Sequence, residues 1–390
     1  MGKRVGMEVS IAIAEAACQA NVDVVAAYPI TPQTHIVEHL SELVADGHLD
    51  AEFVPVESEH SAMSVCIGSS AAGARTFTST SSQGLALMNE VVYIASSLRL
   101  PIVMVVANRS LSAPLSIWND HSDAMSVRDT GWIQVFMENG QEAYDHVFWA
   151  YRVGEDRRVL TPVMIHIDGF ILSHMVESLE LVDNEVVKRY LPPFDPIHRL
   201  HPDKPVTMGA FALPELYTEA KKAQDEALKA SWPVILQGWK EWGDLTGRYY
   251  RPVETHSLEG AEVALVTMGS MGETACEAAD RMRAQGKRVG VVKIRLWRPF
   301  PFQEIRKALQ GVKVAVVFDR CISFGGQGGP VASEVRAALY GESPRPRVIN
   351  FIGGLAGRDV SPGDFQNMVQ EALSREDDRQ ENYKIYGVRE

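Results

Sequence analysis

Three short segments of the sequence place hydroxyl, acidic or basic side chains directly after apolar runs that are typical of buried strands. These segments are Thr31-Pro32, Glu57-Ser58-Glu59-His60 and Asn108-Arg109. At the carboxyl end of a parallel strand, where a helix begins, unpaired backbone amides and the helix dipole favour a bound anion. A substrate carboxylate is therefore a candidate ligand at Thr31-Pro32.

Each segment also has a purely structural interpretation. Thr31 is a good N-cap residue and Pro32 suits the first helical position, so a helix start alone explains this pair. The two glutamates are favoured in a first helical turn for electrostatic reasons, but a glutamate that is partly desolvated there can also hydrogen-bond a cofactor ring nitrogen and share its proton. Arg109 emerges from a buried strand either to form an ion pair or to grip a carboxylate or phosphate.

Two further segments resemble binding motifs only weakly. One is the loop after the third segment, which contains Asp120, His121, Asp123 and Asp129. Their spacing matches no metal site, so we expect no metal and instead a hydrogen-bonded loop over a pocket. The other is the glycine run at residues 325–329. It resembles a phosphate loop but lacks the G-K-[ST] ending, and close packing of a turn explains the glycines equally well.

The elements that must position these residues are those of an α/β fold. Apolar segments rich in β-branched residues alternate with longer segments of helical periodicity, as in a parallel sheet covered by helices. The alternation runs through residues 22–107 and resumes after a boundary near residue 255. We therefore predict a first domain at residues 1–254, with a less regular connecting region from about residue 191, and a second, smaller α/β domain at residues 255–390.

Composition and charge exclude several classes of protein. With 46% hydrophobic and 23% charged residues, the chain has the balance of a globular protein rather than a disordered one. No apolar run approaches the length of a membrane span, and a net charge of −12 argues against a nucleic-acid-binding surface. Glu8, Glu15 and Gln19 interrupt the apolar N-terminal stretch, so we expect a helix of the mature protein there rather than a signal peptide.

The four cysteines, Cys18, Cys66, Cys276 and Cys321, are far apart in the sequence and form no ligand cluster. An iron-sulfur site within the chain is therefore not expected, and each cysteine is best explained as a small buried hydrophobe. Scattered cysteines also fit a reducing compartment better than a disulfide framework, so we expect the chain to be cytoplasmic.

Four motifs that occur in order carry a resemblance to a known family. They are AAYPITPQT (26–34), VESEHSA (56–62), TSTSSQGLALM (78–88) and ANRSLSAPLSIWNDHSD (107–123), and LVTMGSM, IRLWRPFP and FGGQGGP extend the match through the second domain. The sequence resembles the alpha subunit of the pyruvate:ferredoxin oxidoreductase family. The resemblance implies a first domain similar to the pyrimidine-binding domain of thiamine enzymes and a second domain similar to the transketolase C-terminal domain.

The resemblance also implies an activity and three site residues. Glu59 matches the family glutamate that contacts the pyrimidine ring of thiamine diphosphate, where it would hold a proton on the ring nitrogen and favour the imino tautomer. Thr31 and Arg109 match the residues that contact the substrate carboxylate. The implied reaction is the oxidative decarboxylation of pyruvate with coenzyme A to acetyl-CoA and carbon dioxide, with electrons passed to ferredoxin.

A chain of this kind supplies half of an active site, so the resemblance implies partner subunits. These are a beta-type chain that holds the diphosphate and magnesium, a delta-type chain that carries iron-sulfur clusters, and a gamma-type chain. Related enzymes use branched, aromatic or dicarboxylic 2-oxoacids, but Thr31 suits a monocarboxylate, so pyruvate is the first substrate expected. The alternatives are a lipoamide-linked 2-oxoacid dehydrogenase component and a structural subunit without catalytic residues.

Overall fold

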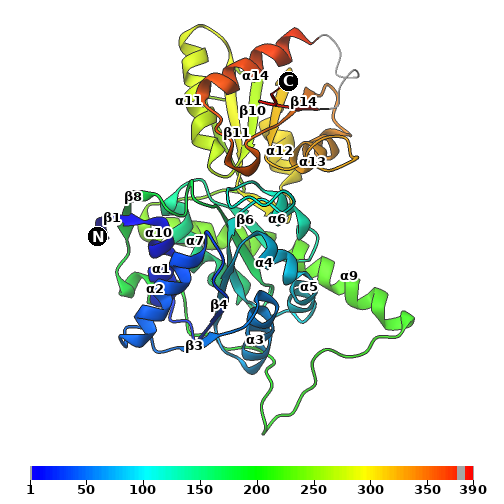
Figure 1. Cartoon of the computed structure of the whole chain (residues 1–390). Coiled ribbons are helices and arrows are strands. Elements are labelled where there is room, and N and C mark those ends of the chain that lie inside the picture. The colour runs from blue at the N-terminus through cyan, green and yellow to red at the C-terminus, as the bar shows by residue number, and fades with distance from the viewer. Residues whose placement is uncertain (1, 376–382, 390) are drawn as a thin grey trace.

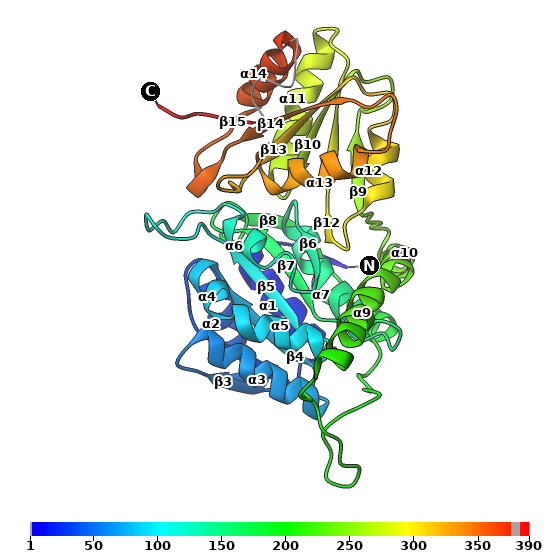
Figure 2. The same cartoon turned by 90° about the vertical axis from the view of Figure 1, so that its right-hand side faces the viewer.

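The structure is a computed structural model that describes residues 2–375 and 383–389. Two α/β bodies are stacked on each other, with the N-terminal body below and the C-terminal body above in Figures 1 and 2. Each body contains a largely parallel sheet. The predicted fold class, two α/β domains in succession, is therefore confirmed.

A seven-stranded sheet forms the centre of the N-terminal body, in the order β12-β6-β7-β5-β4-β2-β3. All of its neighbours pair in parallel except β12, which is antiparallel to β6. All six residues of β5 are buried, because both faces of the sheet are covered. The neighbouring residues Val105 and Val106, for example, belong to the cores on opposite faces. The strands are β2 (Val24–Ala27), β3 (Glu52–Pro55), β4 (Thr76–Thr80), β5 (Val103–Asn108), β6 (Ile133–Phe136), β7 (Val163–Asp168) and β12 (Leu296–Arg298).

Helices cover both faces of this sheet. The core on one face is shared by α1 (Val9–Gln19), α2 (Thr34–Ala45), α7 (Gly140–Gly154), α8 (Asn184–Tyr190) and α10 (Trp232–Thr246). The core on the other face is shared by α3 (Glu59–Ala72), α4 (Ser82–Leu87) and α5 (Asn89–Ser97). Helices α4 and α5 meet at Met88. A short helix, α6 (Ser122–Ser126), lies in the loop after β5.

The two ends of the N-terminal body depart from a simple alternation. The chain starts with a strand, β1 (Lys3–Glu8), which pairs with β8 (Val176–Leu181), so the expected N-terminal helix begins only at Val9. In the region predicted to connect the domains, α9 (Pro214–Ala230) has no buried residue. Helix α9 projects from the side of the body in Figure 1, and the irregular segment before it extends below the body in Figures 1 and 2.

The C-terminal body has a six-stranded sheet in the order β15-β14-β13-β10-β11-β9, and the predicted boundary near residue 255 falls within β9. Its strands are β9 (Val253–His256), β10 (Val263–Met268), β11 (Val289–Ile294), β13 (Val314–Asp319), β14 (Arg347–Ile352) and β15 (Lys384–Ile385). One face packs on α11 (Met271–Ala284) and α14 (Pro362–Ser374), and the other on α12 (Phe302–Ala308) and α13 (Pro330–Leu339). A 3₁₀ turn, η1 (Leu355–Gly357), precedes α14. Among the described residues, no helix combines the length and apolar composition needed to cross a bilayer.

Two histidines are buried in the core of the N-terminal body, and they give a prediction about stability and pH. His146 accepts a hydrogen bond at Nε2 from the Trp239 indole (3.0 Å), while His166 lies in β7. Burial lowers the pKa of both side chains to about 3. Histidines of the unfolded chain bind protons near pH 6.5, so the unfolding free energy should fall as the pH decreases below that value.

The contribution of His146 can be isolated with the variant His146→Gln. Between pH 6.5 and pH 5, the unfolding free energy of the wild-type chain should fall by up to about 2 kcal/mol more than that of this variant. The reason is that each buried histidine contributes a slope of about 1.4 kcal/mol per pH unit. Urea unfolding at the two pH values measures the difference. The exposed His48 provides the control, because His48→Gln should leave the slope unchanged; equal slopes for wild type and His146→Gln would contradict the prediction.

Candidate functional site

Glu59 is a buried acid at the start of a helix. The Ser58 hydroxyl accepts a hydrogen bond from the Ser61 amide (3.2 Å) and caps α3, so Glu59 becomes the first residue of that helix. Its side chain is only 6% exposed. Within residues 2–375 and 383–389, its carboxylate has no hydrogen-bond or ion-pair partner. A buried carboxylate without an internal partner is suited to bind a ligand group that shares a proton with it.

Gly84 makes room for this acid. A Cβ atom at position 84 would lie 2.7 Å from Glu59 Oε1 and 2.5 Å from Thr80 Oγ1, so only glycine fits there. The Glu59 side chain therefore packs directly on the backbone of α4. The Thr80 hydroxyl is buried and has no hydrogen-bond partner among the described residues. The site therefore offers a carboxylate and an unsatisfied hydroxyl next to a glycine, which has no side chain to cover its backbone. These groups suit a planar ring with donor and acceptor nitrogens, such as an aminopyrimidine.

Arg109 carries the positive charge predicted at the end of β5. Its guanidinium donates from Nη1 to the backbone oxygen of Thr31 (3.0 Å) and from Nε to that of Ser116 (2.9 Å). Burial lowers the pKa of Arg109, and the charge of Asp123 opposes this shift. No carboxylate of the described residues forms an ion pair with Arg109, so the internal ion pair that the sequence left open is not found there. Its charge remains available to an anionic ligand.

Thr31 is not the N-cap that the sequence predicted. Helix α2 begins at Thr34, and Thr31 and Pro32 belong to a turn in which the Gln33 amide bonds the Ile30 oxygen (3.0 Å). The reason is a tertiary one. The buried Gln33 side chain accepts from the Ser79 hydroxyl (2.8 Å) and donates to the Tyr28 oxygen (2.9 Å), which holds the turn against β4. The structure thereby brings Thr31 next to Arg109, although they are 78 positions apart.

The loop between β5 and β6 is hydrogen-bonded, as predicted, and its acidic residues do not converge on one point. Asp120 accepts from the Ser122 amide (2.9 Å) and Asp129 is paired with Arg298 (3.2 Å). Asp123 is fully buried, and burial raises its pKa to about 7 although hydrogen bonds from Arg109, Asn108 and Ser82 oppose the shift. The loop borders a cavity of about 680 Å³ between the two bodies.

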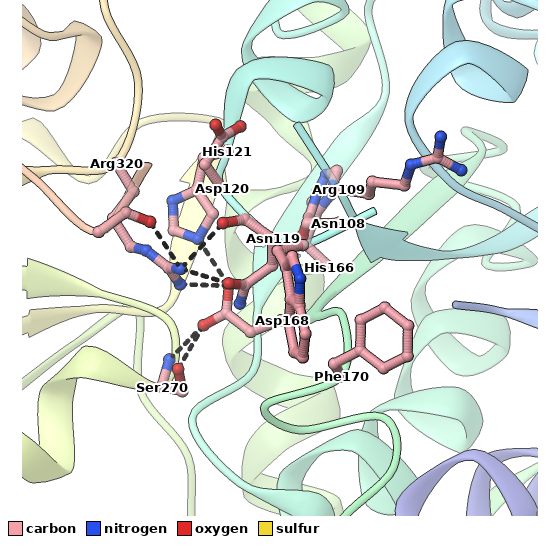
Figure 3. A network of polar contacts seen from close by, with 12 residues as sticks. Asn108, Arg109, Asn119, Asp120, His121, His166, Asp168, Phe170, Ser270 and Arg320 are labelled. Atoms are coloured by element: carbon pink, nitrogen blue, oxygen red, sulfur yellow. Dashed lines mark hydrogen bonds and ion pairs between the residues drawn. The ribbon is translucent and has the colours of Figure 1, made fainter. Parts of the chain in front are cut away.

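A network around Asp168 joins the two bodies (Figure 3). Asp168, at the end of β7, forms an ion pair with Arg320 (2.7 Å) and contacts His121 Nε2 (3.0 Å). Its second oxygen accepts from the Ser270 amide (3.0 Å) and hydroxyl (2.5 Å). Burial raises the pKa of Asp168, but Arg320 and His121 outweigh burial and hold it below its usual range. In Figure 3 the Arg109 guanidinium points away from this network.

The sequence did not single out Asp168, Ser270 or Arg320. The available signal was a polar residue directly after a buried strand, the same feature that marked Arg109. A second set of side chains between the bodies was also not anticipated. It consists of the three clustered carboxylates of Glu138, Glu142 and Glu254. They form ion pairs with Lys293, which lies in β11, and with Arg295, which follows that strand directly.

The glycine run has a structural role. Helix α13 starts at Pro330, and its Val331 and Ala332 amides donate to the Asp319 carboxylate (2.8 and 3.1 Å). A Cβ atom at Gly329 would lie 2.0 Å from the Asp319 side chain, so glycine is needed for this approach. The amides that would bind a phosphate at this helix start are therefore already used.

Comparison with known proteins gives matches over both bodies. The family model described as "Pyruvate flavodoxin/ferredoxin oxidoreductase, thiamine diP-bdg" matches residues 15–236, and "Pyruvate:ferredoxin oxidoreductase core domain II" matches residues 261–365. Pyruvate synthase subunit PorA of Methanothermobacter thermautotrophicus is 48% identical over 92% of each chain, and that of Pyrococcus horikoshii is 48% identical over 95% of each chain. Ketoisovalerate oxidoreductase subunit VorA of Pyrococcus horikoshii is 45% identical over 92% of this chain and 91% of its own.

Two solved structures share the fold at low sequence identity. The 2-oxoglutarate:ferredoxin oxidoreductase from Magnetococcus marinus superposes with a TM-score of 0.73 at 19% identity, over 96% of this chain and 66% of that one. A split-gene transketolase superposes with a TM-score of 0.56 at 15% identity, over 95% and 99% of the two chains. Because the first family model covers more than half of the chain and the PorA relatives are 48% identical over more than nine-tenths of it, the chain belongs to the pyruvate flavodoxin/ferredoxin oxidoreductase family.

Proposed function

We propose that this chain is the alpha-type subunit of a pyruvate:ferredoxin oxidoreductase, which converts pyruvate and coenzyme A to acetyl-CoA and carbon dioxide and passes electrons to ferredoxin. The observation that carries the proposal is the buried Glu59 carboxylate, which lies against the backbone of Gly84 and has no hydrogen-bond or ion-pair partner among the residues that the structure describes. The 48% identity to PorA subunits supports pyruvate as the substrate.

Each site residue has a role that follows from its surroundings. Glu59 binds the aminopyrimidine of thiamine diphosphate and holds a proton on its ring nitrogen. The bound cofactor supplies the electron sink that allows a 2-oxoacid to lose carbon dioxide. Arg109 binds the substrate carboxylate through its charge, and Thr31, whose backbone oxygen is bonded by Arg109, supplies a hydroxyl beside that carboxylate.

The remaining parts of the enzyme belong to other chains in this proposal. A beta-type subunit holds the diphosphate and magnesium, a delta-type subunit carries the iron-sulfur clusters, and a gamma-type subunit completes the complex, which is cytoplasmic. The four cysteines of this chain support the assignment of the clusters elsewhere, because all are free and none lies in a metal-ligand cluster of the described residues.

Purification of the complex and a substrate panel test the proposal. We expect reduction of ferredoxin or a viologen dye with pyruvate and coenzyme A, and slower reduction with 2-ketoisovalerate and 2-oxoglutarate. Faster reduction with 2-ketoisovalerate would favour the second candidate substrate, for which the 45% identity to a VorA subunit is the specific observation. Activity only with a lipoyl partner would overturn the assignment.

The carboxylate-binding role of Arg109 gives a quantitative prediction. Arg109→Ala in the complex should raise the KM for pyruvate by at least about tenfold, because a charge-assisted contact to a carboxylate contributes about 1.5–3 kcal/mol. The matched control is Arg99→Ala. Arg99 likewise donates to two backbone oxygens, those of Val159 and Leu160, and burial also lowers its pKa. An equal effect of both variants on KM would show that Arg109 serves only the packing of the loop.

A further inference from the structure

Asp123 is surrounded by hydrogen-bond donors. Its Oδ2 atom accepts from the backbone amides of Ser82 and Arg109, both at 3.0 Å. Its Oδ1 atom accepts from the Asn108 side chain (2.8 Å) and from the Ala124 amide (2.7 Å). The residue is 0% exposed. All four contacts are N–H donors, so a carboxylate, which offers only acceptors, satisfies each of them at once.

Two of these donors belong to the two halves of the candidate site. Ser82 is the first residue of α4 and lies two positions before Gly84, on which the Glu59 side chain packs. Arg109 carries the guanidinium at the end of β5. The Ser82 hydroxyl also donates to the Ser110 oxygen (2.7 Å), so the start of α4 is tied to the arginine segment by a second bond.

The backbone conformation at the start of α4 depends on these hydrogen bonds. Ser82 has a φ of +45°, in the left-handed region that a serine rarely adopts. A backbone in that region is unfavourable and persists only where the surrounding bonds fix it. The bond from the Ser82 amide to Asp123 is one of these constraints. A change at Asp123 is therefore expected to move α4 and Arg109 together.

We propose that Asp123 is a positioning residue that fixes the spacing between the acid that binds the cofactor, Glu59, and the guanidinium that binds the substrate, Arg109. The inference rests on the proposed function and adds to it a residue that contacts neither ligand. Asp123 acts through two backbone amides, so its loss changes the geometry of the site while every side chain that touches a ligand is retained.

Asp123→Asn in the assembled complex tests the inference. Asparagine has nearly the same shape, but its amide nitrogen cannot accept a hydrogen bond and its carbonyl oxygen is a weaker acceptor than a carboxylate oxygen. In either orientation of the amide, the bonds from Ser82 and Arg109 are therefore lost or weakened. We expect the KM for pyruvate to rise three- to tenfold. We also expect the Ser82 and Arg109 amides to exchange hydrogen at least about tenfold faster, with or without thiamine diphosphate, because a local constraint is removed.

The chain offers a closely matched control in Asp319. This carboxylate is likewise buried and accepts from two backbone amides and an asparagine side chain, those of Val331, Ala332 and Asn350 (2.8, 3.1 and 2.9 Å). Asp319 is the last residue of β13, in the other body, and its carboxylate binds the amides at the start of α13. Asp319→Asn should speed exchange around residues 329–334 and leave the KM for pyruvate unchanged.

The outcomes separate the inference from the proposed function. If Arg109→Ala raises KM but Asp123→Asn changes neither KM nor exchange at Ser82 and Arg109, the positioning role is overturned and the function stands. If neither variant changes KM, the proposed substrate site fails as well. Should Asp123→Asn not assemble, Asn108→Ala removes one bond to the same carboxylate and should raise KM about two- to threefold; an unchanged KM and unchanged exchange would overturn the role.

Discussion

Replacing Glu59 by glutamine is expected to lower the turnover of the assembled enzyme by about a hundredfold or more, the scale of a general acid-base contribution. Glutamine keeps the length and shape of the side chain, so it still fits against Gly84. It has no acidic proton to share with the pyrimidine nitrogen. The loss should therefore appear in kcat with pyruvate saturating, and ferredoxin or viologen reduction by the purified complex measures it.

The neighbouring acid provides the control for this experiment. Glu57 is exposed, and a hydrogen bond from the Ser61 hydroxyl (2.5 Å) lowers its pKa. Glu57→Gln should change turnover less than about twofold, since surface substitutions away from a site have small effects. Binding of thiamine diphosphate, followed by quenching of tryptophan fluorescence, shows whether Glu59→Gln also weakens the cofactor. Unchanged turnover in Glu59→Gln would favour a subunit with a structural role only.

Replacing Arg320 by methionine is expected to lower the free energy of unfolding of the chain by about 3–5 kcal/mol, because it leaves a buried charge without its cation. Asp168 is 2% exposed and its pKa is held below its usual range by Arg320 and His121, so it stays charged at neutral pH. Arg320 also bonds the Asn119 side chain (2.7 Å) in the loop above the cavity. Urea unfolding of the full chain measures the loss.

An exposed ion pair of the same kind shows what burial contributes. Arg288 pairs with Glu262 at the surface, where the two side chains are 63% and 34% exposed. Arg288→Met should cost less than about 1 kcal/mol, because water screens an exposed pair. A similar, small loss in both variants would mean that the charge of Asp168 is compensated by His121 and Ser270 alone.

Rules based on local sequence predicted the strands correctly and failed at one turn of the candidate site. The buried, β-branched run of β5 predicted both its strand and the emergence of Arg109 at its end. Thr31-Pro32 matched the rules for a helix start equally well, yet the helix begins at Thr34, two residues after the predicted first helical position, Pro32. The Gln33 side chain decided this by bonding Ser79 on β4, a contact that no helix-capping rule contains.

The sequence by itself determined the alternation of strands and helices, the two α/β domains in succession and, through its ordered motifs, the family. These properties depend on periodicity and residue type along a short stretch of chain. Only the tertiary structure decided which polar groups meet: the Thr31 oxygen with Arg109, the Ser82 and Arg109 amides with Asp123, and Asp168 with Arg320. Such contacts depend on the order of strands within the sheet and on the packing of the two bodies, and neither is a local property of the chain.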